Sequence, residues 1–165
     1  MTSVALDPGD VTWVAPLNDH GVSEDANRLR RLLGGVQRDL TVGVSLTAPH
    51  RVAFEALLDT LAEATRAGWD GQGARPVSPD AALRAHVFIS LLPTTLPAPD
   101  VSADPTGRVH FEWRRGQGRA FVVSVGPGDV VHYAGLFGRN TAHGSEELSD
   151  EIPRAVLANL ARALG

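Results

Sequence analysis

Four short segments with alternating apolar residues, joined by turns, constrain the fold of this chain most strongly. They span residues 101–103, 108–114, 119–125 and 129–135. Residue types that favour turns lie between them, in Asp104-Pro105-Thr106-Gly107, Gly116-Gln117-Gly118 and Gly126-Pro127-Gly128. Because a period of two is typical of half-buried strands, we predict an antiparallel meander of about four strands.

Side-chain parity predicts the register of the central hairpin. Residues that face each other in an antiparallel pair lie on the same side of the sheet. Pairing Trp113 with Phe121 satisfies this rule, and so does pairing Phe111 with Val123. This register leaves a three-residue loop, which is a common hairpin length with Gly available for positive φ.

About three helices are predicted to pack against this sheet. They run from Pro49 to Gly68, from Ser78 to Pro93 and from near Ser149 to Leu164. Ser78 is a favourable N-cap, and Pro79 fits the first helical position. In the last helix, Asp150 and Glu151 would lie in the first turn, where the helix dipole favours negative charge. Helices on one face of a sheet bury both sets of apolar residues, so the predicted class is α+β.

The chain divides into two predicted parts. Residues 1–48 form an N-terminal segment in which we expect a strand, a helix and a second strand. The helix begins at Ser23, an N-cap followed by two acids, and the second strand is the alternating run 40–47. Residues 49–165 form the α+β module, which has the size of one domain.

Composition excludes several kinds of chemistry. The 165 residues include no Cys and no Lys, so the chain has no thiol nucleophile, Schiff-base lysine or P-loop lysine. The formal net charge of −4 argues mildly against nucleic-acid binding, which needs a basic face. Residues 1–21 do not resemble a signal peptide, and no run approaches the roughly 20 apolar residues of a membrane span. We expect a bacterial protein in the cytoplasm, without a membrane partner.

The first of two Gly-rich motifs is Gly68-Trp69-Asp70-Gly71-Gln72-Gly73-Ala74. Its spacing matches neither a GxGxxG fingerprint nor a P-loop, and no strand precedes it. We therefore expect a helix-to-helix connection in which Trp69 fills the core and Asp70 caps backbone N–H groups. Binding of a ligand or a partner by this loop is the alternative.

The second Gly-rich motif is Tyr133-Ala134-Gly135-Leu136-Phe137-Gly138, and His143-Gly144-Ser145-Glu146 follows it. We expect the strand to end in this motif, with Leu136 and Phe137 covering the edge of the sheet. Ser145 or Ser149 would then cap the last helix. The segment contains neither a GxSxG elbow nor an HExxH motif, and a binding rim at Arg139 is the alternative.

The predicted register places His110 and Glu112 on the outward face of the sheet, with His132 two strands from Glu112, across Val122. His and Glu are common ligands of Zn²⁺ and Mn²⁺. However, strands two apart are separated by roughly 9–10 Å, which is long for sharing one ion. We therefore expect a solvated polar face, with no metal and no cofactor.

A series of motifs runs along the module: Trp69-Asp70-Gly71-x-Gly73-Ala74, Leu92-Pro93, Gly107, Glu112-Trp113, Tyr133-Ala134-Gly135-Leu136-Phe137-Gly138 and Gly144. Their order resembles that of a group of small bacterial proteins with no assigned activity. The resemblance spans about residues 68–160. It implies that the two Gly-rich motifs belong to one unit, and it assigns no catalytic residue.

The leading hypothesis is a non-catalytic interaction domain that binds a protein partner, as an antitoxin, immunity or defence-accessory component. It rests on the absence of a recognisable nucleophile–base pair, metal cluster or cofactor motif from the sequence. The expected contact residues are Trp69, Asp70, Phe137, Arg139 and His143.

Two alternatives stay open at this point. A small hydrolase or nuclease would use side chains that converge across loops, drawn from Asp70, His110, Glu112, His132 and His143. A nucleic-acid binder would use the hairpin that carries Arg114, Arg115 and Arg119. Convergence of Asp70, His143 and these arginines on one pocket would favour a single site.

Overall fold

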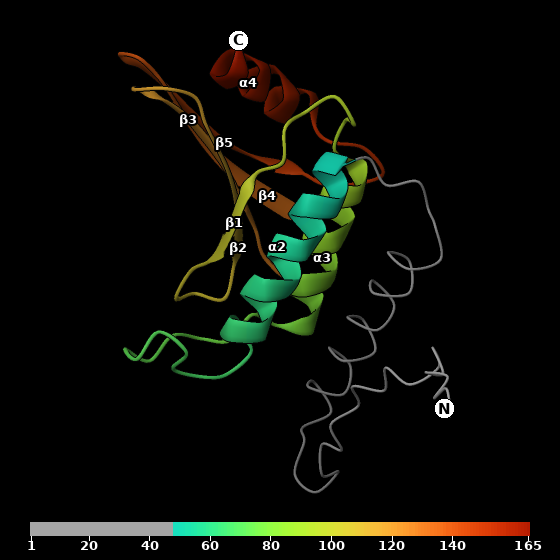
Figure 1. Ribbon diagram of the computed structural model, residues 1–165, viewed down its shortest axis with the longest axis vertical. Helices are drawn as coiled ribbons and strands as arrows, with labels where there is room; N and C mark the ends of the chain where they lie inside the picture. The colour runs from blue at the N-terminus through green and yellow to red at the C-terminus, as the bar shows by residue number, and fades with distance from the viewer. Residues whose placement is uncertain (1–47) are drawn as a thin grey trace, which may run out of the picture.

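The computed structural model describes residues 48–165, in which a five-stranded sheet carries helices on one face (Figure 1). The helices are α2 (Ala48–Ala64), α3 (Pro79–Leu91) and α4 (Arg154–Leu164). The strands are β1 (Asp100–Ala103), β2 (Val109–Arg114), β3 (Arg119–Val125), β4 (Val130–Phe137) and β5 (Asn140–Glu147). The predicted α+β class is confirmed. The strand–helix–strand predicted before residue 48 lies outside the described residues.

The sheet is an antiparallel meander in which each strand pairs with the next along the chain, in the order β1-β2-β3-β4-β5. The predicted register is confirmed, because Trp113 pairs with Phe121 and Phe111 with Val123. Alternate residues of these strands are fully buried, since they face the helices. The large apolar residues therefore set the register by parity.

The strand β5 was not predicted, and the expectation that the last strand ends at residue 135 is wrong. β4 continues to Phe137, the chain turns at Gly138 and Arg139, and β5 pairs back along the whole of β4. Strand β5 lacks an apolar alternation, because two of its inward positions are Ala142 and Gly144. An edge strand without large apolar side chains shows no alternation of apolar and polar residues, so it could not be predicted from the sequence.

The last helix begins later than predicted. The expectation placed its first turn at Asp150 and Glu151, whereas α4 begins at Arg154, with Pro153 as its extended N-cap. A proline disfavours the helical conformation of the residue before it, which favours a helix start after Ile152. Asp150 and Glu151 therefore do not stabilise the first turn of α4 through the helix dipole, because that turn contains no acidic residue.

The core fills the space between the helices and the inner face of the sheet. At its centre the ring of Phe88 on α3 packs on Phe111 of β2, with 4.8 Å between ring centroids. The start of α3 is confirmed, since the Ser78 side chain accepts a hydrogen bond from the backbone N–H of Ala81. Leu83 of α3 is exposed, however, and the buried side of that helix is rich in alanine.

Two aromatic rings explain the glycines of the second Gly-rich motif. The ring of Phe137 occupies the place that a Cβ at Gly135 would take, at 2.4 Å from its ideal position. The ring of Tyr133 covers Gly144 of the neighbouring strand in the same way, with its hydroxyl oxygen at 2.5 Å and its nearest ring carbon at 2.7 Å from the ideal Cβ position. A side chain at either position would displace the ring that covers it.

None of the helices in residues 48–165 is long and apolar enough to span a membrane.

Candidate functional site

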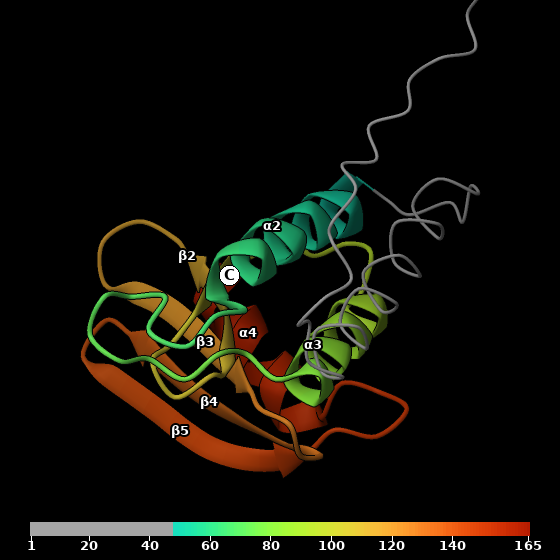
Figure 2. The ribbon, with the colours of Figure 1, turned by 90° about the horizontal axis from the view of Figure 1, so that it is seen from below.

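The face of the sheet opposite the helices has no cover from any element of the described chain (Figure 2). Its outward side chains form rows across the strands. One row contains only serine and histidine, one from each strand: Ser102, His110, Ser124, His132 and Ser145. The next row contains Asp100, Glu112, Val122, Ala134 and His143. Polar side chains thus give way to small apolar ones along the strands.

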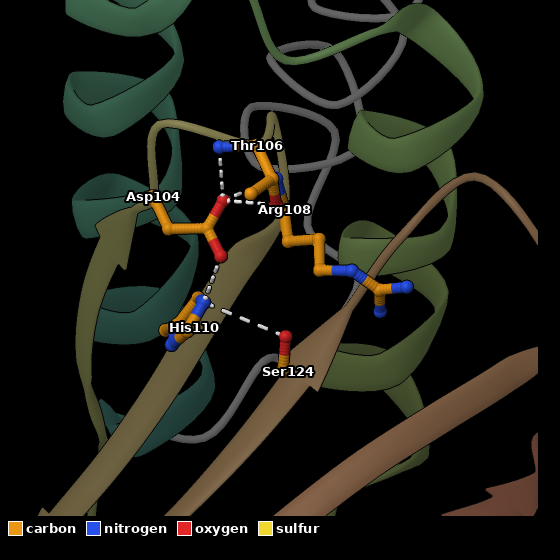
Figure 3. Close-up of polar contacts among 5 residues, drawn as sticks. All are labelled: Asp104, Thr106, Arg108, His110 and Ser124. Carbon is orange, nitrogen blue, oxygen red and sulfur yellow. Dashed lines mark hydrogen bonds and ion pairs between the residues drawn. The ribbon is translucent and has the colours of Figure 1, made fainter. Parts of the chain in front are cut away.

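At one end of this face, Asp104 organises the turn between β1 and β2 (Figure 3). Its Oδ1 accepts hydrogen bonds from the backbone N–H groups of Thr106 (2.8 Å) and Arg108 (3.2 Å) and from the Thr106 hydroxyl (2.6 Å). Its Oδ2 lies 2.9 Å from Nε2 of His110. Burial raises the pKa of Asp104, but hydrogen bonds from the Thr106 and His110 side chains and from both backbone groups outweigh it and lower the pKa to about 2.

Ser124, His110 and Asp104 lie within reach of one another, yet they do not form a catalytic triad. Ser124 Oγ is 3.4 Å from Nε2 of His110, the same nitrogen that contacts Asp104 (Figure 3). A triad uses one ring nitrogen for the acid and the other for the nucleophile. Because ionised Asp104 only accepts, Nε2 carries the hydrogen and cannot take a proton from Ser124. The cluster holds the turn rather than activating a nucleophile.

Arg108 extends from this turn across the sheet, away from Asp104 and His110 (Figure 3). Its guanidinium packs on Gly126, at 3.3 Å from the ideal Cβ position of that glycine. The Nη1 atom is buried and has no hydrogen-bond partner among the described residues. The side chain therefore covers the start of the turn between β3 and β4.

The proposed metal trio is not assembled. His132 lies in the row of His110, across Ser124, and not across Val122 from Glu112 as expected. The Glu112 carboxylate is bound by Arg114, at 2.7 Å from Nε. Nδ1 of His132 lies 2.6 Å from the Ser145 hydroxyl. No group of three metal-binding side chains occurs in residues 48–165.

A shallow hollow of about 310 Å³ lies on the open face where β3, β4 and β5 meet. Its walls are mostly small and apolar: Ala120, Val122, Ala134, Gly135, Leu136, Thr141, Ala142 and His143. Leu136 is 41% exposed although its strand, β4, is paired on both sides. Sequence reasoning missed this hollow, since it depends on β5 being present as its outer wall.

Arginine side chains gather at the end of the sheet next to this hollow, and we call this group the arginine end. It comprises Arg114, Arg115, Arg119, Arg139 and Arg162, all of them exposed. The two hairpin turns there lie side by side, because the N–H of Gly138 donates to the carbonyl of Gly118 (2.7 Å). The α4 helix adds Arg162, whose guanidinium stacks on Phe137 at 4.2 Å from the ring centroid.

The first Gly-rich motif forms the predicted turn, in which Asp70 accepts hydrogen bonds from backbone N–H groups, but this turn is not part of the open face. Asp70 Oδ1 accepts from the backbone N–H groups of Gln72 (2.8 Å) and Ala74 (3.0 Å), and these hydrogen bonds, chiefly that of Ala74, lower the pKa of Asp70. Trp69 is half-buried, and its indole N–H donates to the carbonyl of Arg75 (3.2 Å).

This loop lies at the far end of the sheet from the arginine end (Figure 1). The N–H of Arg75 donates to the carbonyl of Pro105, in the β1–β2 turn (2.9 Å). The structure therefore brings His143 and Arg139 toward the hairpin arginines and leaves Trp69 and Asp70 apart from them. Phe137 lies on the inner side of the sheet, half-buried under Arg162.

No protein-family model matches this chain, and no curated protein or solved structure matches it significantly.

Proposed function

We propose that the protein is a non-catalytic interaction domain that binds an acidic, partly apolar segment of a partner protein on the open face of its sheet. The observation that carries the proposal is the position of the apolar hollow directly beside the arginine end. Ala120 lines the hollow and pairs with Arg114, which lies on the same face of the sheet. Apolar and cationic contacts are thus available within one footprint.

The apolar part of the footprint supports binding of a protein side chain. An exposed leucine among alanines and valines, in a concave surface without cover from the described chain, is the kind of patch that marks an interaction site. Small residues in the floor leave room for a larger side chain from the partner. Leu136 and Val122 would contact that side chain.

The charged part of the footprint selects an acidic partner. Arg115 and Arg119 carry positive charge at one end of a chain whose formal net charge is −4, and Arg114 beside them is paired with Glu112. Such a local field attracts and orients carboxylate groups. A nucleic acid would also be attracted, but the outward rows of the described sheet hold no Phe, Tyr or Trp on which bases could stack, and their only aromatic side chains are histidines. These features support a protein partner, and a role as an antitoxin, immunity or defence-accessory component stays part of the proposal.

The proposal is tested by recovering partners of the tagged full chain from its native host, with and without Leu136→Glu. This change places a negative charge in the hollow, and we expect the partner recovered with the wild-type chain to be lost. Leu83→Glu is the matched control, because Leu83 is also 41% exposed but lies on α3, away from the open face. Circular dichroism should show that both variants fold.

Recovery of the same protein with Leu136→Glu as with the wild-type chain would overturn the proposal. Recovery of nuclease-sensitive nucleic acid in place of a protein, lost on Arg114→Ala and Arg115→Ala, would replace it with the nucleic-acid alternative. A bound partner with no acidic surface, unaffected by these arginine changes, would contradict the electrostatic part.

A further inference from the structure

The two edges of the sheet are built differently. Strand β1 has four residues, lies beside α2, and the carbonyl of its Val101 accepts a hydrogen bond from the Thr60 hydroxyl of that helix (3.2 Å). Strand β5 has eight residues, and no other described strand or helix lies beyond it (Figure 2). One edge is short and partly capped, whereas the other is long and open.

The hydrogen-bonding groups that β5 presents at its free edge follow from the pairing with β4. The N–H of Leu148 donates to the carbonyl of Asp129 (2.6 Å), which continues the register in which Glu147 pairs with Val130. In an antiparallel strand the N–H and C=O of alternate residues point to opposite sides. The odd-numbered residues Thr141, His143, Ser145 and Glu147 therefore direct these groups away from β4.

This edge carries few of the devices that usually prevent pairing with another strand, and its only charged side chains are Glu146 and Glu147 at its end. Proline, lysine and bulges blunt exposed edges in natural sheets. Strand β5 contains neither proline nor lysine, it keeps one continuous register over its whole length, and its first six residues carry no carboxylate or arginine. An open edge of this length is a template for an added strand.

We propose that a second copy of this chain pairs with β5 in antiparallel fashion, with His143 opposite His143 of the second copy. Such pairing joins two five-stranded sheets into one, and it keeps the open faces of both copies on the same side. The two hollows then lie next to each other across the two-fold axis. This dimer goes beyond the proposed function, because it does not require the partner protein.

Parity and charge select this register. Only residues of the same face can lie opposite each other, so the two registers that overlap most place either His143 or Gly144 on the axis. With His143 on the axis, Arg139 of each copy lies opposite Glu147 of the other. With Gly144 on the axis, Glu147 lies opposite Thr141 and no opposite charges meet. Opposite charges directly across a ladder are stabilising.

The first test measures sedimentation velocity of the full chain over a range of about 10–500 µM, which brackets the weak affinities of small interfaces. We expect a concentration-dependent dimer. His143→Pro removes an edge N–H without removing a bond to β4 and should give a monomer. His143→Thr is the matched control, since it keeps the N–H and a strand-favouring residue, and it should still dimerise.

The second test reverses charges at the ends of the paired strands. Glu147→Arg and Arg139→Glu should each weaken the dimer about tenfold, because each replaces two attractive pairs by repulsive ones. The double variant Arg139→Glu with Glu147→Arg should restore the wild-type affinity. A wild-type chain that is monomeric throughout the range overturns the dimer. If His143→Pro left the dimer unchanged, pairing through the free edge of β5 would be ruled out. If the double variant did not restore the affinity, the register with His143 on the axis would be ruled out.

Discussion

The two faces of the sheet use the same strands for different purposes. On the inner face Phe111, Phe121 and Val123 are fully buried against the helices. On the outer face their chain neighbours Glu112 and Val122 lie under no element of the described chain. Because successive side chains of a strand point to opposite sides, one segment can supply stability and a recognition surface independently. Substitutions on the two faces should therefore separate folding from binding.

The largest effect is expected from Phe111→Ala on the inner face. The side chain is fully buried and packs on Phe88 with 4.8 Å between ring centroids, so its removal leaves a cavity at the centre of the core. We expect a loss of about 3–5 kcal/mol in the free energy of unfolding, measured by urea denaturation followed by circular dichroism. A loss below about 1 kcal/mol would mean that the core is not packed as described.

The Asp104 turn is where the outer face also contributes to stability, and Asp104→Asn should have an intermediate effect. An amide replaces a carboxylate that accepts three hydrogen bonds at Oδ1 and contacts His110 at Oδ2. We expect a loss of about 1–3 kcal/mol near neutral pH, measured by urea denaturation. His132→Gln is the control, because His132 lies in the same row but contacts only the Ser145 hydroxyl among the bonds described.

The same prediction has a pH dependence with a definite sign. The pKa of Asp104 falls from 3.8 to about 2 on folding, so the folded state favours the ionised form. Its contribution to stability is complete above pH 3.8 and is lost as the pH falls toward about 2. The difference in unfolding free energy between wild-type and Asp104→Asn should shrink over this window. A constant difference across it would contradict the assigned role of the carboxylate.

Much of the fold could be predicted because large residues carry strong local signals. The alternation around Trp113 and Phe121 determined the register of β2 and β3, and Ser78 with Pro79 marked the start of α3. The Asp70 turn was also predictable, since an aspartate between glycines readily hydrogen-bonds the backbone that follows it. These features depend only on residues close together in the chain.

The site was harder to predict because it depends on an element without a pattern. The two central inward positions of β5, Ala142 and Gly144, are small, and Tyr133 from the neighbouring strand fills the space over Gly144. Without β5 there is no outer wall for the hollow and no open edge at His143. The contact of Arg162 with Phe137 could not be predicted for another reason, because Arg162 lies on a helix that is distant from Phe137 in the chain.

The smallest effect on stability is expected from Leu136→Ala on the outer face. Leu136 is 41% exposed, and its truncation leaves no enclosed cavity, so the change should stay within about 0.5 kcal/mol in urea denaturation. Partner recovery should nevertheless fall, because the side chain offers the largest apolar contact in the hollow. Phe111→Ala should behave in the opposite way, retaining the partner at temperatures where it stays folded. If Leu136→Ala destabilised the fold as much as Phe111→Ala does, the outer face would be part of the core, and the separation of the two faces would fail.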